Sequence, residues 1–351
     1  MSSIGKRKPD DKAIDKRDNK RHKSLDAESS SLDKALVLKI ISFLTLEESI
    51  RYFSLLSKSM QKIVYEFLTD LTLSYESWSH LENINSRIIK FTSKLTNLKS
   101  LTIDGFDEFN DMALNNLLHK NVQSTFAELH IRDCAIVNPR VNHDTLKVLK
   151  ISTCNNISTI AVQSTSLETF EVFDCDFERA PKLIQCTSLA NIKLNRCRKL
   201  TDHKLGLILK QFIPNGGYAN SQSQGEEANE RRTSVQVDPP QTLKKLYLTE
   251  CEPLSNPVMQ SMTLVDLRFI NCRSMRNPII TCPMLQNLQL TWCENLENLT
   301  LGCDTLKALD LTGTGVNNTA VGAQNSQTSS VRESILSAVK THYSDQVTVS
   351  Y

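Results

Sequence analysis

The residues of this chain with the plainest chemical potential are its ten cysteines. Thiolates bind zinc, and thiols in suitable geometry form disulfides. Seven cysteines share one position of a repeated phrase, and three share a second position, three residues before a leucine. No close C-x-x-C pair and no histidine pair at ligand spacing accompanies them, so we predict core packing, with metal or disulfide bonding as the alternative. The two sets are Cys134, Cys154, Cys175, Cys197, Cys251, Cys272 and Cys293, and Cys186, Cys282 and Cys303.

Catalytic signatures are missing from the sequence. It contains no phosphate-cradling G-x-x-x-x-G-K-[ST], no H-E-x-x-H and no G-x-S-x-G. Histidines are scattered, and His130, at an outward strand position, is expected to make a surface contact rather than act as a base. We therefore predict that the chain is not an enzyme by itself and holds no metal and no cofactor.

The composition is that of an ordinary globular protein, with 40% apolar residues, 23% charged residues and a net charge of +2. No apolar run approaches the roughly 20 residues that span a bilayer, and the N-terminus carries no apolar signal segment. We expect a soluble intracellular protein with no membrane partner.

A phrase of the form apolar-x-x-apolar-x-apolar-x-x-Cys occurs nine times, with Phe106 and Thr314 replacing cysteine in the first and last copies. Most copies start 20 to 22 residues apart, which indicates one coil of equal size per copy. Such a coil cannot bury its own apolar edge, so neighbouring coils must stack. The sequence therefore predicts a curved α/β solenoid of parallel strands over residues 74–316. The copies begin at Leu98, Phe126, Leu146, Leu167, Leu189, Leu243, Leu264, Leu285 and Leu306.

Alternation inside the phrase predicts a strand with one buried face, as in Leu149-Lys150-Ile151. A second apolar cluster about eleven residues later, such as Leu296, Leu299 and Leu301, predicts an extended back to several coils. Residues 109–118 and 200–212 have helical spacing instead, so helix-backed and strand-backed coils are expected to mix. A first strand is predicted at residues 71–73 and a helix at residues 78–91.

Segments outside the repeats differ in composition. Residues 1–31 form a basic tail predicted to be disordered, residues 32–73 three short amphipathic helices, and residues 317–351 a C-terminal cap with a helix at 331–343 and a closing strand. A docking tail is the alternative for the cap. Residues 214–240 interrupt the repeats and are predicted to be a disordered insertion, because the phrase resumes in phase at Leu243.

Two basic clusters in the tail are read as a nuclear import signal. The residues proposed for import are Lys6, Arg7, Lys8, Lys20, Arg21 and Lys23. A solvated tail and phosphate contact with nucleic acid are the alternatives, and interspersed aspartates disfavour a grip on DNA. The expected location is the nucleus, with the cytoplasm as a second location.

Residues 31–64 resemble an F-box. The matching residues are Leu32, Leu36, Ile40, Ser42, Phe43 and Leu44, then Ile50, then Leu56-Ser57-Lys58. Asp33, Ala35 and Met60 stand where the family has proline, an acidic residue and tryptophan, so the F-box is degenerate. Followed by cysteine-containing repeats, residues 32–316 resemble the F-box/leucine-rich-repeat proteins of the cysteine-containing subfamily.

This resemblance implies the substrate-recognition subunit of an SCF-type cullin–RING ubiquitin ligase. The F-box would bind a Skp-type adaptor, itself joined to a cullin scaffold, and the concave repeat face would hold a protein marked for ubiquitination and proteasomal degradation. The adaptor-binding residues implied are Leu32, Leu36, Ile40, Phe43, Leu44 and Leu56. The alternative is a nuclear scaffold of the same fold that binds protein or DNA without a link to ubiquitin.

Outward strand positions point to the residues that contact a target protein. Aromatic and arginine side chains dominate binding energy at protein interfaces. We predict substrate contact at Phe173, Tyr247, Arg268, Ile270 and Trp292. For Trp292, which directly precedes Cys293, the alternative is that the ring covers the edge of a coil.

Overall fold

The computed structural model describes residues 62, 65–79, 82–120, 125–212 and 243–314, and the backbone of residues 348–350. The chain divides into two compact units, residues 1–68 and 69–351. In the first unit the described residues are few and partly helical, with Lys62 Nζ 3.9 Å from Glu66 Oε1. The predicted basic tail and most of the predicted F-box helices, with every adaptor-binding and import residue named above, lie outside the described residues.

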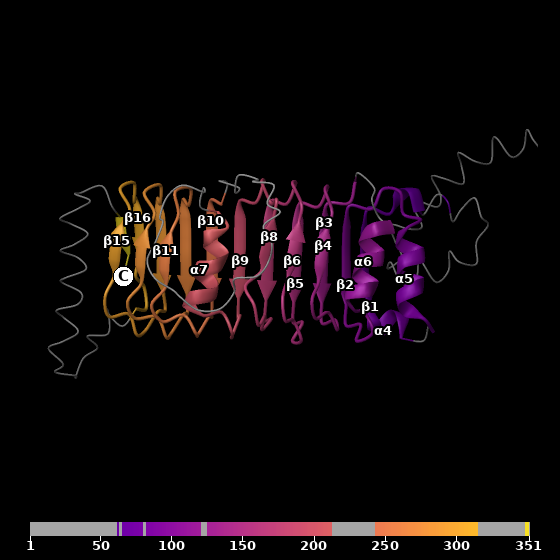
Figure 1. The fold of residues 1–351 in the computed structure, drawn as a ribbon, viewed down its shortest axis with the longest axis horizontal. Coiled ribbons are helices and arrows are strands. Elements are labelled where there is room, and N and C mark those ends of the chain that lie inside the picture. Colours follow the sequence, from indigo (N-terminus) through magenta and orange to yellow (C-terminus); the bar gives the residue numbers. More distant parts are fainter. Residues whose placement is uncertain are drawn as a thin grey trace, which may run out of the picture. The chain divides into compact units, whose positions relative to one another are not determined.

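The second unit is a solenoid of parallel strands (Figure 1). Its largest sheet has eleven strands in the order β1-β2-β3-β5-β7-β9-β10-β12-β14-β16-β17. Every pairing in this sheet is parallel, and from β1 to β16 the paired strands belong to successive coils. The strands are β1 (Asp70–Ser74), β2 (Ser100–Asp104), β3 (Glu128–Arg132), β5 (Val148–Ser152), β7 (Thr169–Phe173), β9 (Asn191–Asn195), β10 (Lys245–Thr249), β12 (Asp266–Ile270), β14 (Asn287–Thr291), β16 (Ala308–Asp310) and β17 (Thr348–Ser350).

Strand alternation places the core as the sequence predicts. In β3 the second and fourth residues, Leu129 and Ile131, are buried, while the residues on either side of them are half-buried or exposed. The same pattern recurs in neighbouring strands because side chains alternate between the two faces of a strand. Strand β10 pairs with β9 in register, so the coil that resumes at Leu243 continues the stack without a shift.

The backs of the coils are of two kinds, also as predicted. Short strands form two three-stranded parallel sheets, β4-β6-β8 and β11-β13-β15. Their bounds are β4 (Arg140–Asn142), β6 (Ala161–Gln163), β8 (Lys182–Ile184), β11 (Val258–Gln260), β13 (Ile279–Thr281) and β15 (Thr300–Gly302). Helices α4 (Tyr75–Trp78), α5 (Ile84–Thr92), α6 (Asp111–Lys120) and α7 (Asp202–Lys210) take this place elsewhere (Figure 1).

The single helix predicted over residues 78–91 is wrong. The structure has α4 and α5 instead, and Asn83 between them adopts a left-handed backbone with φ of 56°. A right-handed helix cannot continue through that conformation, so a new helix begins at Ile84.

Two helix-backed coils are bonded to the next coil in the same way, through an aspartate in the first turn of the helix. The carboxylate of Asp111, in the first turn of α6, accepts bonds from the N–H groups of Val137 and Asn138 at 3.1 and 2.8 Å. Asp202, in the first turn of α7, likewise accepts from Ser255 and Asn256 at 3.2 and 2.9 Å. A carboxylate here also suits the positive end of the helix dipole. These bonds hold each helix to the strand-backed coil that follows.

All ten cysteines are buried with free thiols, which confirms the predicted core packing. The thiol of Cys134 contacts the carbonyl of Arg132 at 3.1 Å, and the thiol of Cys293 contacts that of Thr291 at 3.7 Å. Burial raises the pKa of both thiols to about 12, so they stay protonated and unreactive at neutral pH. Among the described residues, no cluster of three or more His, Cys, Asp or Glu side chains is arranged to hold a metal ion.

The end of the stack is described in part. Strand β17 pairs in parallel with β16, in agreement with the predicted closing strand. The predicted cap helix and the predicted insertion at 214–240 lie outside the described residues, and the predicted curvature and domain boundaries stay predictions. Within the described ranges, no helix combines the length and the apolar character that crossing a membrane requires.

Candidate protein-binding face

The first, third and fifth residues of each five-residue strand point away from the core and together form one surface of the main sheet, here called the outward face. On β10 these residues are Lys245, Tyr247 and Thr249, which are exposed or half-buried while Leu246 and Leu248 are fully buried. Because the strands are in parallel register, outward residues of neighbouring coils align in three rows across the sheet.

Three residues in the C-terminal part of the outward face form a tyrosine–arginine cluster: Tyr247, Asp266 and Arg268. The Tyr247 hydroxyl donates to Asp266 Oδ2 at 2.7 Å. Arg268 donates to the same carboxylate from Nε at 3.1 Å and from Nη2 at 3.0 Å. Its guanidinium carbon also lies 4.5 Å from the Tyr247 ring centroid, at cation–π distance.

The carboxylate of Asp266 is the fixed centre of this cluster. Only 9% of its side chain is exposed, whereas 41% of the Arg268 side chain is exposed. The hydrogen bond to Asp266 raises the pKa of Arg268. Burial, followed by the hydrogen bond to Asp266, raises the pKa of Tyr247. At neutral pH the cluster therefore presents a charged guanidinium and a neutral phenol, both held in one orientation by hydrogen bonds to Asp266.

The N-terminal part of the outward face contains a groove of about 730 Å³. Ion pairs cross it: Arg132 Nε lies 2.8 Å from Asp104 Oδ1, and Glu171 is shared between Lys150 at 3.4 Å and Lys193 at 2.6 Å. Burial alone would raise the pKa of Glu171, but the hydrogen bond to Lys193 and the charges of both lysines outweigh it and lower that pKa. The groove is thus lined by charges of both signs, and ion pairs join most of them to a partner.

His130 lies in this groove, where its Nε2 is 2.8 Å from Ser152 Oγ. Burial first, then the charges of Lys150 and Arg132, lowers its pKa below the ordinary value. The ring is therefore neutral at neutral pH and is held by its hydrogen-bonding contact with Ser152.

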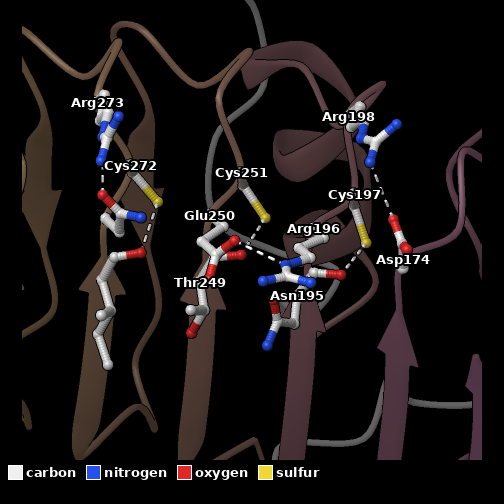
Figure 2. A network of polar contacts seen from close by, with 12 residues as sticks. Asp174, Asn195, Arg196, Cys197, Arg198, Thr249, Glu250, Cys251, Cys272 and Arg273 are labelled. Atoms are coloured by element: carbon white, nitrogen blue, oxygen red, sulfur yellow. Dashed lines mark hydrogen bonds and ion pairs between the residues drawn. The ribbon is translucent and has the colours of Figure 1, made fainter.

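Phe173 lines the same groove and is exposed. The guanidinium carbon of Arg196 lies 5.6 Å from its ring centroid, and Arg196 Nε donates to Glu250 Oε2 at 2.7 Å (Figure 2). The neighbouring Arg198 Nη2 lies 3.5 Å from Asp174 Oδ1 (Figure 2). These contacts link the groove rim to the coil of β10.

A left-handed corner after each strand is a feature that the sequence reasoning missed. The residue before each phrase-closing position has a positive φ in all nine copies: Gly105, Asp133, Thr153, Asp174, Arg196, Glu250, Asn271, Trp292 and Gly313. In the first eight, the backbone N–H donates to a carbonyl of the next coil, as from Thr153 to Phe173 at 2.9 Å. Glycine in the first and last copies, with Asp and Asn between, was the available signal because these residues tolerate this conformation best.

The structure brings together three of the five predicted contact residues. Tyr247, Arg268 and Ile270 lie on the adjacent strands β10 and β12. Phe173 lies apart on β7, with β9 in between. Trp292 lies at a corner after β14 rather than on the outward face, and 55% of it is exposed. Its ring packs against Gly313, where an added Cβ would come within 2.6 Å of it. The ring therefore covers the edge of the last coil, which is the alternative given for it above. Their roles in binding stay predictions.

Comparisons with known proteins return little. No family model matches the chain, and no curated protein matches it. A solved structure described as "Crystal structure of Rad7 and Elc1 complex in yeast" is similar, with a TM-score of 0.35 and 14% sequence identity over 95% of this chain and 96% of that chain.

Proposed function

We propose that this chain is a substrate-recognition subunit of an SCF-type ubiquitin ligase, built as a degenerate F-box followed by leucine-rich repeats. Two features support the proposal: the F-box-like sequence of residues 31–64, and an outward face suited to holding a protein. The observation that carries it is the tyrosine–arginine cluster on that face, where the buried carboxylate of Asp266 holds Tyr247 and Arg268 in place.

The size of the outward face fits this role. Strands about 4.8 Å apart make nine rungs about 40 Å long, and a five-residue strand spans about 16 Å. The resulting area approaches the roughly 800 Å² that one partner contributes to a standard protein interface. Aromatic and arginine residues, fixed before binding, lose little entropy when a partner arrives.

In this role the chain needs no catalytic residue of its own. The F-box helices bind the adaptor through Leu36, Ile40 and Phe43, while the outward face binds the target. Holding the target beside the ubiquitin-carrying enzyme raises its effective concentration there. The basic clusters near the N-terminus direct this assembly to the nucleus.

The test is co-purification of the full chain with a Skp-type adaptor and a cullin. We expect both to be recovered, and we expect Phe43→Asp with Leu44→Asp to abolish adaptor recovery while captured target proteins remain. As a control, Met112→Asp changes an exposed apolar side chain of α6 and leaves adaptor recovery unchanged.

Absence of adaptor and cullin under gentle conditions contradicts the proposal. Target capture that survives such an absence identifies the nuclear scaffold instead.

A further inference from the structure

Two parts of the outward face differ in the sign of their net charge. We call the outward residues of β9, β10, β12 and β14 the cationic half; they include Lys193, Lys245 and Arg268 against a single carboxylate, Asp266. The remaining members are Asn191, Asn195, Tyr247, Thr249, Ile270, Asn287, Gln289 and Thr291. The outward residues of β2, β3, β5 and β7, the mixed half, carry Arg132 and Lys150 against Asp104, Glu128 and Glu171.

The one carboxylate of the cationic half does not oppose an anionic ligand. Asp266 is buried, and its oxygens already accept three hydrogen bonds from Tyr247 and Arg268. None of these bonds uses Nη1 of Arg268, and the guanidinium is substantially exposed. The cluster can therefore offer donors to a ligand while its internal bonds stay intact.

The carboxylates that border the cationic half are also engaged within the protein. On one side Glu171 is paired with Lys150 and Lys193. On the other side Asp310 accepts from Thr312 Oγ1 at 2.7 Å and from Gln289 Nε2 at 3.3 Å. Between these borders the exposed charges are positive, and Lys245 is exposed with no ion pair among the described contacts.

We infer that the cationic half binds an acidic, extended peptide segment of the target protein. This inference rests on the proposed function, because it takes the outward face as the surface that holds the target. Lys193, Tyr247 and Arg268 align in one row on successive strands, so Lys193 and Arg268 are two rungs, or about 10 Å, apart. Residues i and i+3 of a polyproline-II segment are about 9 Å apart on one side of the chain.

The geometry thus selects two carboxylates three residues apart. One pairs with Lys193 and the other with Nη1 of Arg268, while the intervening backbone lies over the Tyr247 ring. Lys245, one row away on the same strand as Tyr247, adds a third positive charge. The half-buried Ile270 gives an apolar contact beside Arg268.

A protein segment fits this surface better than a nucleic acid does. A nucleic acid strand carries a phosphate on every nucleotide and is held by a continuous basic track. Here the positive charges lie on three strands, β9, β10 and β12, and are bordered on both sides by carboxylates, Glu171 and Asp310. A short acidic peptide can place its charges between those borders.

The experiment measures fluorescence anisotropy of labelled peptides mixed with the purified full chain. The probes are a peptide of sequence type E-x-x-E, the matched Q-x-x-Q peptide, a peptide with adjacent glutamates, and a labelled single-stranded DNA. We expect the E-x-x-E peptide to bind at least about tenfold more tightly than Q-x-x-Q. We expect it also to bind more tightly than the peptide with adjacent glutamates.

Charge reversal provides the matched control. Lys245→Glu should weaken E-x-x-E binding about tenfold, and Lys99→Glu, at an exposed lysine directly before β2, should change it less than about twofold. Thermal unfolding of both variants should match that of the unaltered chain.

Several outcomes overturn the inference: equal binding of the Glu and Gln peptides, equal losses in the two lysine variants, or tighter binding of DNA with a steep salt dependence. Recovery of the adaptor is measured on the same preparations. Adaptor recovery without acidic-peptide preference removes this inference alone. Acidic-peptide binding without adaptor recovery removes the ubiquitin-ligase role and leaves the peptide site.

Discussion

The cationic half and the mixed half of the outward face share one backbone but use their acidic residues differently. In the mixed half, Glu171 lies at the surface and pairs with both Lys150 and Lys193, the latter on β9, so the three side chains together keep one positive charge. In the cationic half, Asp266 is buried beneath the Arg268 and Tyr247 side chains on the same face and fixes both through hydrogen bonds. The buried apolar residues of a coil determine where its strand lies, so the residue types at outward positions can differ from one coil to the next. The difference is that Asp266 is covered by the side chains it binds, whereas Glu171 stays at the surface, so the cationic half presents charge that its own acid does not face.

The largest expected difference between the two halves is in the free energy of unfolding when Asp266 or Glu171 is replaced by alanine. Asp266→Ala leaves the Tyr247 hydroxyl and two Arg268 nitrogens without their acceptor, and should lower the free energy of unfolding by about 2 kcal/mol. Glu171→Ala breaks more exposed ion pairs and should lower it by less than about 1 kcal/mol. Urea unfolding of both variants measures the difference.

Asp266→Asn is the control for this pair, because it keeps an oxygen acceptor of the same size. Its loss should be smaller than that of Asp266→Ala. Equal losses in the Asp266→Ala and Glu171→Ala variants would contradict the distinction between a buried organising acid and a surface partner.

A second comparison uses the glycine corners at the two ends of the stack. Gly313 has φ of 69°, and an added Cβ would lie 2.6 Å from Cε3 of Trp292. Gly105 has φ of 78°, but its added Cβ would meet Tyr75 Cβ at an ordinary 3.4 Å. We expect Gly105→Ala to cost about 1 kcal/mol for the left-handed backbone, and Gly313→Ala about 2 kcal/mol because the exposed ring must also move.

Thermal unfolding of the two alanine variants measures this difference. The chain has two tryptophans, Trp78 and Trp292, so the change in fluorescence of Gly313→Ala relative to the unaltered chain reports the environment of Trp292. The double variant Trp292→Ala with Gly313→Ala should recover the part of the loss that the clash causes. If the double variant recovers nothing, the Trp292 ring does not cover the last coil in solution.

The sequence allowed the fold to be predicted further than the site. Alternation and a fixed repeat are local signals, so the strands, the mixed coil backs and the phase of the coil at Leu243 could be predicted. The role of Asp266 could not, because it depends on the burial of one side chain and on Tyr247 one coil earlier. An alignment of the copies predicts that Asp266, Arg268 and Tyr247 lie near one another. It does not predict the hydrogen bonds between them. The left-handed corners depend on backbone geometry that mixed residue types hide.

The smallest expected effect concerns pH and His130. Its pKa in the folded protein is below the ordinary value of 6.5, because of burial first and then the charges of Lys150 and Arg132. As pH falls through about 6.5, the unfolded chain therefore takes up the proton first. The stability that neutral His130 contributes is present above that pH and is lost as pH falls toward its folded-state pKa. His130→Gln should remove this slope, as urea unfolding across that range would show.

The same titration distinguishes the two halves of the outward face. The described outward residues of β9, β10, β12 and β14 include no histidine, so binding of the E-x-x-E peptide should not change over this range, in which its glutamates stay ionised. A protonated His130 adds positive charge between Lys150 and Arg132 in the mixed half alone. Peptide affinity that follows the His130 titration would place the peptide in the groove, and so reverse the assignment of the two halves.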